Sequence, residues 1–112
     1  MTKSPQAYFE DILESIELVQ KYVTGKSLEQ FRTDKLLQDG IIRRMEIIGE
    51  AVKHVPQDIR VKYPEIPWRD ISGMRNFLIH EYFGVNLNWV WETIKNELPE
   101  LEKQIRLILY SD

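Results

Sequence analysis

SPQAYFEDILESIELVQKYVTG, residues 4–25, carries the clearest helical pattern in the chain. Its apolar side chains recur every three or four residues, which places them on one face of an α-helix: Tyr8, Phe9, Ile12, Leu13, Ile16, Val19, Tyr22 and Val23. Ser4 can cap the first turn, and Pro5 fits the first helical position because its missing amide hydrogen has no partner there. Gly25 tolerates the left-handed conformation that follows a last turn. These signals predict a helix that begins after Ser4 and ends before Gly25.

A second long helix is predicted to begin at Thr33 or Asp34 and to end at Pro56. Its apolar stripe comprises Leu36, Leu37, Ile41, Met45, Ile48, Val52 and Val55. Gly40 and Gly49 interrupt it, and each weakens a helix by about 1 kcal/mol relative to alanine. We predict that they permit another helix to approach closely, the alternative being that the helix simply tolerates them. Between the two long helices, residues 27–30 have the form of a capping box and predict a short helix that ends near Phe31.

The remaining sequence predicts three more helical segments. Residues 57–63 form a short one between two prolines, and another begins at Pro67–Trp68 and runs to about Tyr82. After Gly84, Asn86 caps a last helical region with a kink or restart at Pro99, because proline lacks the amide donor. The inward side chains of that region are Leu87, Val90, Trp91, Ile94, Leu98, Leu101, Ile105, Ile108 and Leu109. With no strand-like alternation, repeat or linker, the chain is predicted to be all-α.

The most economical arrangement is an up-and-down bundle of four main helices plus short helices, folded as a single domain over residues 1–112. Hydrophobic residues make up 43% of the chain, enough for a core. There is no cysteine, which excludes disulfides and thiolate zinc sites and favours the reducing cytoplasm. No apolar run approaches a membrane span, and the N-terminus is not a signal peptide. We therefore expect a cytoplasmic protein without a membrane association.

The charge distribution bears on possible ligands. The net charge is −3, which argues against a general polyanion binder. Residues 31–80 are the net-positive part, with nine basic and seven acidic side chains. A local phosphate-binding patch and ordinary solvated helix faces account for this equally well.

One segment of the chain, residues 71–83, ISGMRNFLIHEYF, carries side chains suited to chemistry. The imidazole of His80, with an ordinary pKa of about 6.5, could remove the proton of a ribose 2′-hydroxyl. The guanidinium of Arg75 could hold a scissile phosphate through two parallel hydrogen bonds, and Asn76 could orient His80 or a phosphate oxygen. Such a route needs neither a metal nor a cofactor, and it leaves a 2′,3′-cyclic phosphate and a 5′-hydroxyl.

Helical geometry limits how these residues can act together. At about 100° per residue, Arg75 and Tyr82 lie within about 20° of each other, whereas Arg75 and His80 are about 140° apart. A shared phosphate site therefore needs either a distorted helix or a second copy of the segment facing the first. A twofold homodimer supplies that second copy.

The pair Arg75-Asn76, followed by His80 and Tyr82, resembles the motif of HEPN domains, and specifically of HepT-like toxins. The resemblance extends from about Tyr8 to Leu109 and includes the segments at 63–71 and 85–91. It implies a homodimeric helical bundle with a composite Arg-x4-His-x-Tyr cleft, acting as a ribonuclease toxin of a type VII-like toxin–antitoxin pair.

The resemblance also implies how the toxin is silenced. Its antitoxin would be a minimal nucleotidyltransferase that adds AMP to the motif tyrosine, here Tyr82. An AMP phosphate on that phenol would lie beside the guanidinium of Arg75 and would occupy the place of the substrate phosphate.

Two other interpretations stay open. The chain could be a non-catalytic HEPN module that binds a nucleotide or the partner enzyme, or a structural helical dimer without chemistry. Among the remaining candidates, His54 is predicted to be structural, because no arginine or carboxylate accompanies it in a comparable pattern. Trp89 and Trp91 are predicted to serve the core and an interface. Arg43 and Arg44 are either an RNA-facing patch or a solvated helix face.

Overall fold

The computed structural model describes residues 3–80 and 86–110, apart from the side chains of Phe77, Ile79 and His80. Most of these residues are helical and none of them lies in a strand, which confirms the all-α class. The elements are α1 (Pro5–Val23), α2 (Leu28–Thr33), α3 (Lys35–Lys53), α4 (Gln57–Lys62), α5 (Trp68–His80), α6 (Leu87–Glu92), the π-helical turn η2 (Thr93–Glu97) and α7 (Leu98–Tyr110).

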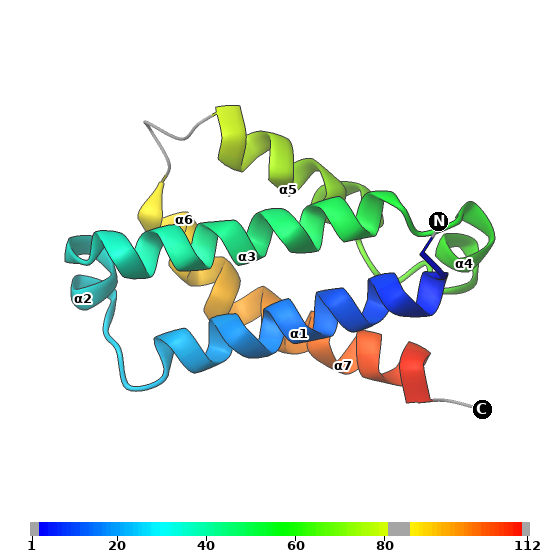
Figure 1. Ribbon diagram of the computed structural model, residues 1–112, viewed down its shortest axis with the longest axis horizontal. Coiled ribbons are helices and arrows are strands. Elements are labelled where there is room, and N and C mark those ends of the chain that lie inside the picture. The colour runs from blue at the N-terminus through cyan, green and yellow to red at the C-terminus, as the bar shows by residue number, and fades with distance from the viewer. Residues whose placement is uncertain (1–2, 81–85, 111–112) are drawn as a thin grey trace.

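The long helices form an up-and-down bundle (Figure 1). α1, α3, α5 and the α6–α7 segment run in alternating directions, and α3 packs against both α1 and α5 while α7 packs against α1. The bundle of four main helices is therefore confirmed, and the homodimer remains a prediction. No helix in the described ranges has the length and apolarity needed to cross a membrane.

Several helix ends follow the expected local chemistry. The side chains of Ser4, Asp34 and Asn86 each accept a hydrogen bond from an amide in the first turn of the helix that follows. Asp34, the second of the two predicted start residues, is thus the N-cap of α3. The capping box at residues 27–30 is complete. Gly25 has a φ of 75°, the left-handed conformation predicted after α1.

The core lies between α1, α3, α5 and the α6–α7 segment. Its fully buried side chains include Ile12, Ile16, Val19, Phe31, Ile41, Met45, Ile48, Val52, Leu78, Val90 and Ile105. Leu36 corrects one expectation, because its side chain is 84% exposed instead of belonging to the α3 stripe. The buried stripe contains Ile41, and five residues of helix place Leu36 about 140° from it.

The predicted interruption at Pro99 is a π-helical turn, η2, that directly precedes it. The amide of Leu98 donates to the carbonyl of Thr93, five residues earlier. A proline ring clashes with the carbonyl four residues before it in a regular α-helix. The wider turn relieves this conflict and lets the chain continue into α7.

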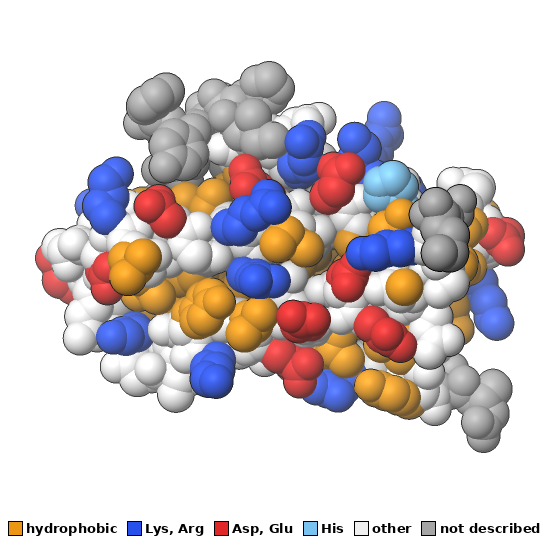
Figure 2. Space-filling model, viewed as in Figure 1, with side chains coloured by type: hydrophobic (Ala, Val, Ile, Leu, Met, Phe, Trp, Pro, Cys, Tyr) orange, Lys and Arg blue, Asp and Glu red, His pale blue; other side chains and the backbone are white. Residues whose placement is uncertain are grey.

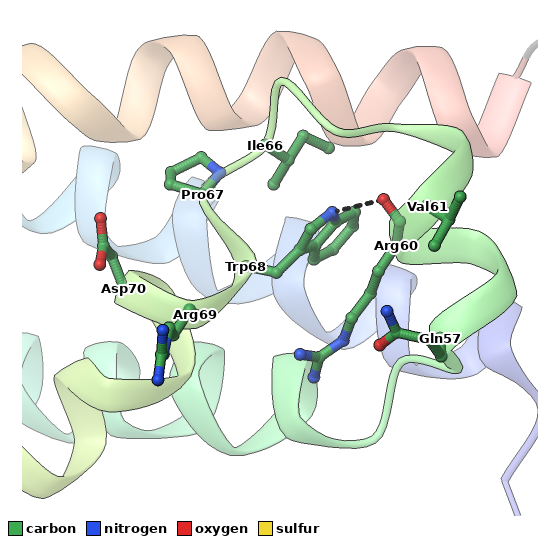
Figure 3. Close-up of a pocket in the computed structure, with 8 residues that line it drawn as sticks. All are labelled: Gln57, Arg60, Val61, Ile66, Pro67, Trp68, Arg69 and Asp70. Atoms are coloured by element: carbon green, nitrogen blue, oxygen red, sulfur yellow. Dashed lines mark hydrogen bonds between the residues drawn. The ribbon is translucent and has the colours of Figure 1, made fainter.

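The start of α5 is tied to the end of α3 through α4 (Figure 3). The indole Nε1 of Trp68 donates to the carbonyls of Tyr63 at 3.0 Å and Arg60 at 3.2 Å. The guanidinium of Arg60 in turn donates to the carbonyls of Val52 at 2.7 Å and Val55 at 3.1 Å, which lie at and just beyond the end of α3. These bonds fix where α5 begins relative to α3.

Candidate active site

α3 and α5 lie close together at Gly49. A Cβ added there would lie 3.1 Å from the Cβ of Arg75 and 3.1 Å from the carbonyl oxygen of Ile71. Only a residue without a side chain lets the two backbones lie this close. The close approach predicted for Gly49 is confirmed, whereas at Gly40 an added Cβ would make an ordinary contact of 3.6 Å with the ring of Tyr22.

The residue after Gly49 binds the predicted catalytic arginine. Oε2 of Glu50 lies 3.0 Å from Nε of Arg75, and the two side chains are 46% and 37% exposed. Half-exposed ion pairs contribute little to stability. The pair is an ionic contact without hydrogen-bond geometry, since Oε2 of Glu50 is buried without a hydrogen-bond partner among the described residues, and it keeps the guanidinium beside α3. Its terminal nitrogens form no hydrogen bond or ion pair with the described residues, so they are available to a ligand.

The other oxygen of Glu50 faces His54. Oε1 lies 3.5 Å from Nε2 of His54, an ion pair when the imidazole is protonated. The His54 ring stacks on Tyr8 with 4.9 Å between centroids and 8° between planes. Side chains from α1, α3 and α5 thus meet around one carboxylate. The expectation that no carboxylate accompanies His54 was wrong, because Glu50 lies one turn earlier on the same helix face.

These side chains line a cavity of about 410 Å³. Its lining residues are Lys3, Tyr8, Asp11, Arg43, Glu46, Ile47, Glu50, Ala51, His54 and Arg75. The hydrogen bond from Lys3 to Asp11 raises the pKa of Lys3. Basic and acidic side chains are interspersed over this face of the molecule (Figure 2). The cavity therefore lies in a face of mixed charge, and Arg75 is the cation that α5 contributes to it.

The structure places only some of the predicted motif. α5 is continuous through Arg75, Asn76 and His80, so the separation of about 140° between Arg75 and His80 applies to this helix. Asn76 is exposed beside Arg75. The side chain of His80 and the whole of Tyr82 lie outside the described residues. Which atoms His80 and Tyr82 meet therefore remains a prediction.

Three residues of this cavity escaped the sequence argument: Tyr8, Glu50 and His54. A signal for two of them was present. Glu50 and His54 are four residues apart, the spacing that makes neighbours on a helix. Glu50 also follows the glycine at which a helix contact was predicted. Tyr8 had no such signal, because it reaches the cavity only through the packing of α1 on α3.

The tryptophan pair divides between two environments. Trp91 is buried to 9% exposure and packs on Phe31 with 5.5 Å between ring centroids. Its predicted core role is confirmed. Trp89 is 38% exposed, and its predicted interface role remains a prediction.

Comparison with known proteins gives consistent matches. The family described as "Ribonuclease HepT-like" matches residues 12–108. A protein of Caldanaerobacter subterraneus subsp. tengcongensis, named as a candidate RNase, is 49% identical over 110 residues, 98% of each chain. A Thermococcus cleftensis protein named "Probable ribonuclease HepT" is 45% identical over 102 residues, 91% of this chain and 93% of the relative.

A third relative, from Methanocaldococcus jannaschii, is named a gamma-glutamylcyclotransferase and candidate RNase. It is 47% identical over 109 residues, which are 97% of this chain and 49% of that protein. No solved structure gave a significant match.

Proposed function

The chain belongs to the HepT-like ribonuclease family, and on that premise we propose that it is a metal-independent endoribonuclease, the toxin of a toxin–antitoxin pair. It acts in the cytoplasm as a homodimer. The names of its relatives support the ribonuclease part of this proposal.

The bond between Glu50 and Arg75 is the observation that carries the proposal. Glu50 is paired with Nε, and the terminal nitrogens of Arg75 form no hydrogen bond or ion pair with the described residues, so they can donate to two oxygens of one phosphate. A guanidinium held by a neighbouring carboxylate needs little reorganisation as charge develops on that phosphate. The exposure of the Arg75 side chain, 37%, leaves it accessible to a substrate as large as RNA.

The proposed reaction is transfer of the phosphoryl group to the neighbouring ribose hydroxyl. His80 removes the proton of the 2′-hydroxyl, and the 2′-oxygen attacks phosphorus. The bond from phosphorus to the 5′-oxygen breaks, and that oxygen takes up a proton. Arg75 stabilises the additional negative charge, and Asn76 orients His80 or a phosphate oxygen. The products are a 2′,3′-cyclic phosphate and a 5′-hydroxyl.

A second copy of the chain completes the site. Arg75 and His80 lie on the same helix about 140° apart, so a single copy directs them to different places. In a twofold dimer each segment faces its mate. We therefore assign Arg75 of one protomer and His80 of its partner to one phosphate.

Silencing would act on Tyr82. A minimal nucleotidyltransferase partner would transfer AMP from ATP to the phenol oxygen, with release of pyrophosphate. The added phosphate would compete with RNA for the guanidinium of Arg75, and its charge would repel the substrate.

The deciding experiment incubates the purified protein with RNA in the presence of a chelator. Cleavage that leaves cyclic-phosphate ends, and that is lost in His80→Ala with the helical circular dichroism unchanged, supports the proposal. A folded wild-type protein that leaves RNA intact under these conditions would refute it. The chain would then be a binding module.

A further inference from the structure

A second cavity, of about 940 Å³, lies between α5 and the α6–α7 segment. We refer to it as the α5–α7 groove. Its floor is apolar and includes Ile71 and Met74 from α5 and Leu98 and Leu101 from α7. Met74, Leu98 and Leu101 are buried, and Ile71 is partly exposed. The floor thus lies between two helices, the form of groove in which an amphipathic helix binds.

Gly73 on α5 borders open space in the α5–α7 groove. Gly73 lies inside the helix and is exposed, and a Cβ added there would meet no atom of the described residues within 4 Å. Glycine inside a helix is less stable than alanine by about 0.5–1 kcal/mol. At Gly49 the contact with Arg75 explains that cost. No contact with the described residues explains it at Gly73, and the space beside it in those parts of the chain is open to an external ligand.

Acidic side chains surround the floor. Glu65, Asp70, Glu97 and Glu100 line the α5–α7 groove, as does Glu92, and Arg69 is the basic residue among the described lining residues. None of the five carboxylates forms an ion pair with a described residue. This excess of negative charge repels RNA phosphates, and it also opposes a face-to-face contact with the same groove of a second copy. It favours a cationic occupant.

We propose that the α5–α7 groove docks a basic amphipathic helix of a partner protein. Apolar side chains of that helix lie on Met74 and Leu101, and its lysines or arginines face the carboxylates. The lining residues on the α6–α7 segment run from Trp89 to Gln104, a length of about 20 Å, roughly three to four turns of a docked helix. This interaction surface is independent of ribonuclease activity, because it uses none of the residues assigned to phosphate chemistry.

The test uses the full chain and a fluorescently labelled synthetic helix with leucines at helical spacing and lysines elsewhere. Its binding is followed by fluorescence anisotropy at low salt. Gly73→Trp, which fills the groove, is expected to weaken binding at least about tenfold, whereas Gly73→Ala changes it by less than about threefold. Charge reversal by Glu97→Lys with Glu100→Lys weakens it by at least about tenfold, and Glu14→Lys on α1 serves as the matched control.

Three results would overturn the proposal. The first is equal binding of a peptide with glutamates in place of the lysines. The second is an affinity that survives both the Gly73→Trp variant and the double charge reversal, with folding verified by circular dichroism. The third is dissociation of the dimer by these variants in sedimentation experiments, which would make the groove a contact between copies of this chain.

Discussion

Glu50 and Arg75 form an ion pair across the contact between α3 and α5, with Oε2 and Nε 3.0 Å apart. The pair lies one residue beyond Gly49, where an added Cβ would lie 3.1 Å from atoms of α5. The helix contact therefore sets the position of the arginine. Glu50 is accordingly a positioning residue, because it acts on Arg75 and not on substrate.

Two substitutions of Glu50 distinguish its effect on the orientation of Arg75 from the effect of its own negative charge. Glu50→Ala is expected to lower kcat by about tenfold to a hundredfold, because the guanidinium loses its partner and small displacements of a reacting group are costly. Glu50→Gln keeps an acceptor for Nε while removing a negative charge near the phosphate. We expect it to retain most of kcat and to lower KM. Steady-state cleavage of a labelled RNA gives both constants, and equal loss in the two variants would contradict a positioning role.

Arg75→Lys is expected to be nearly as harmful as removal of the side chain. A lysine keeps the charge but cannot bind Glu50 and also present two parallel donors to one phosphate. The loss in kcat should be about a hundredfold or more. The same assay measures it, and Arg44→Lys on α3 is the matched control that should retain activity. Near wild-type cleavage by Arg75→Lys would show that charge alone is enough.

Gly49 on α3 and Gly73 on α5 should respond to alanine with changes in stability of opposite sign. Gly49→Ala places a Cβ 3.1 Å from atoms of Arg75 and Ile71, including backbone, so α3 and α5 must separate. That strain outweighs the gain in helix propensity, and we expect a net loss of about 1 kcal/mol in the free energy of unfolding. The Cβ of Gly73→Ala meets no neighbour within 4 Å in the part of the chain that the structure describes, and the variant should gain about 0.5–1 kcal/mol. Urea denaturation measures both, and a stabilised Gly49→Ala would contradict the tight contact.

Mixing two inactive variants tests the shared site. Arg75→Ala and His80→Ala homodimers each lack one half of every site. In a heterodimer, one site receives Arg75 from one chain and His80 from the other. Random reassortment of subunits should therefore restore about a quarter of wild-type activity. If both residues of a site came from one protomer, the mixture would stay inactive, and that result would exclude the composite cleft.

Tyr82→Phe removes the phenol oxygen that AMP would occupy. Co-expressed with a minimal nucleotidyltransferase of the proposed partner class, the wild-type chain should gain about 329 Da per AMP residue, the mass added when a phenol displaces pyrophosphate from ATP. The phenylalanine variant should gain nothing and should remain a ribonuclease. Intact-mass spectrometry distinguishes the two, and modification of the variant would move the acceptor to another residue.

Local signals in the sequence were enough to place most helices, because caps and stops depend on neighbouring residues. The Ser27–Gln30 box and Gly25 are examples. The prediction that Leu36 is buried was wrong because spacing alone does not say where the edge of an apolar face lies. The role of Glu50 was missed for a different reason. Its partner, Arg75, is 25 positions away, and only the packing of α3 on α5 brings the two together. Arg75 could be chosen from its motif, but its orientation could not.

Arg75 and Met74 are neighbours on α5, yet one lines the smaller cavity and the other the floor of the α5–α7 groove. The helix is thus a common wall between two surfaces. Suppose that a ligand in the α5–α7 groove shifts α5 and thereby changes the affinity of the smaller cavity for its own ligand. Thermodynamic reciprocity then requires that the ligand of the smaller cavity change the affinity of the groove by the same factor. A measured coupling in one direction would therefore fix its value in the other.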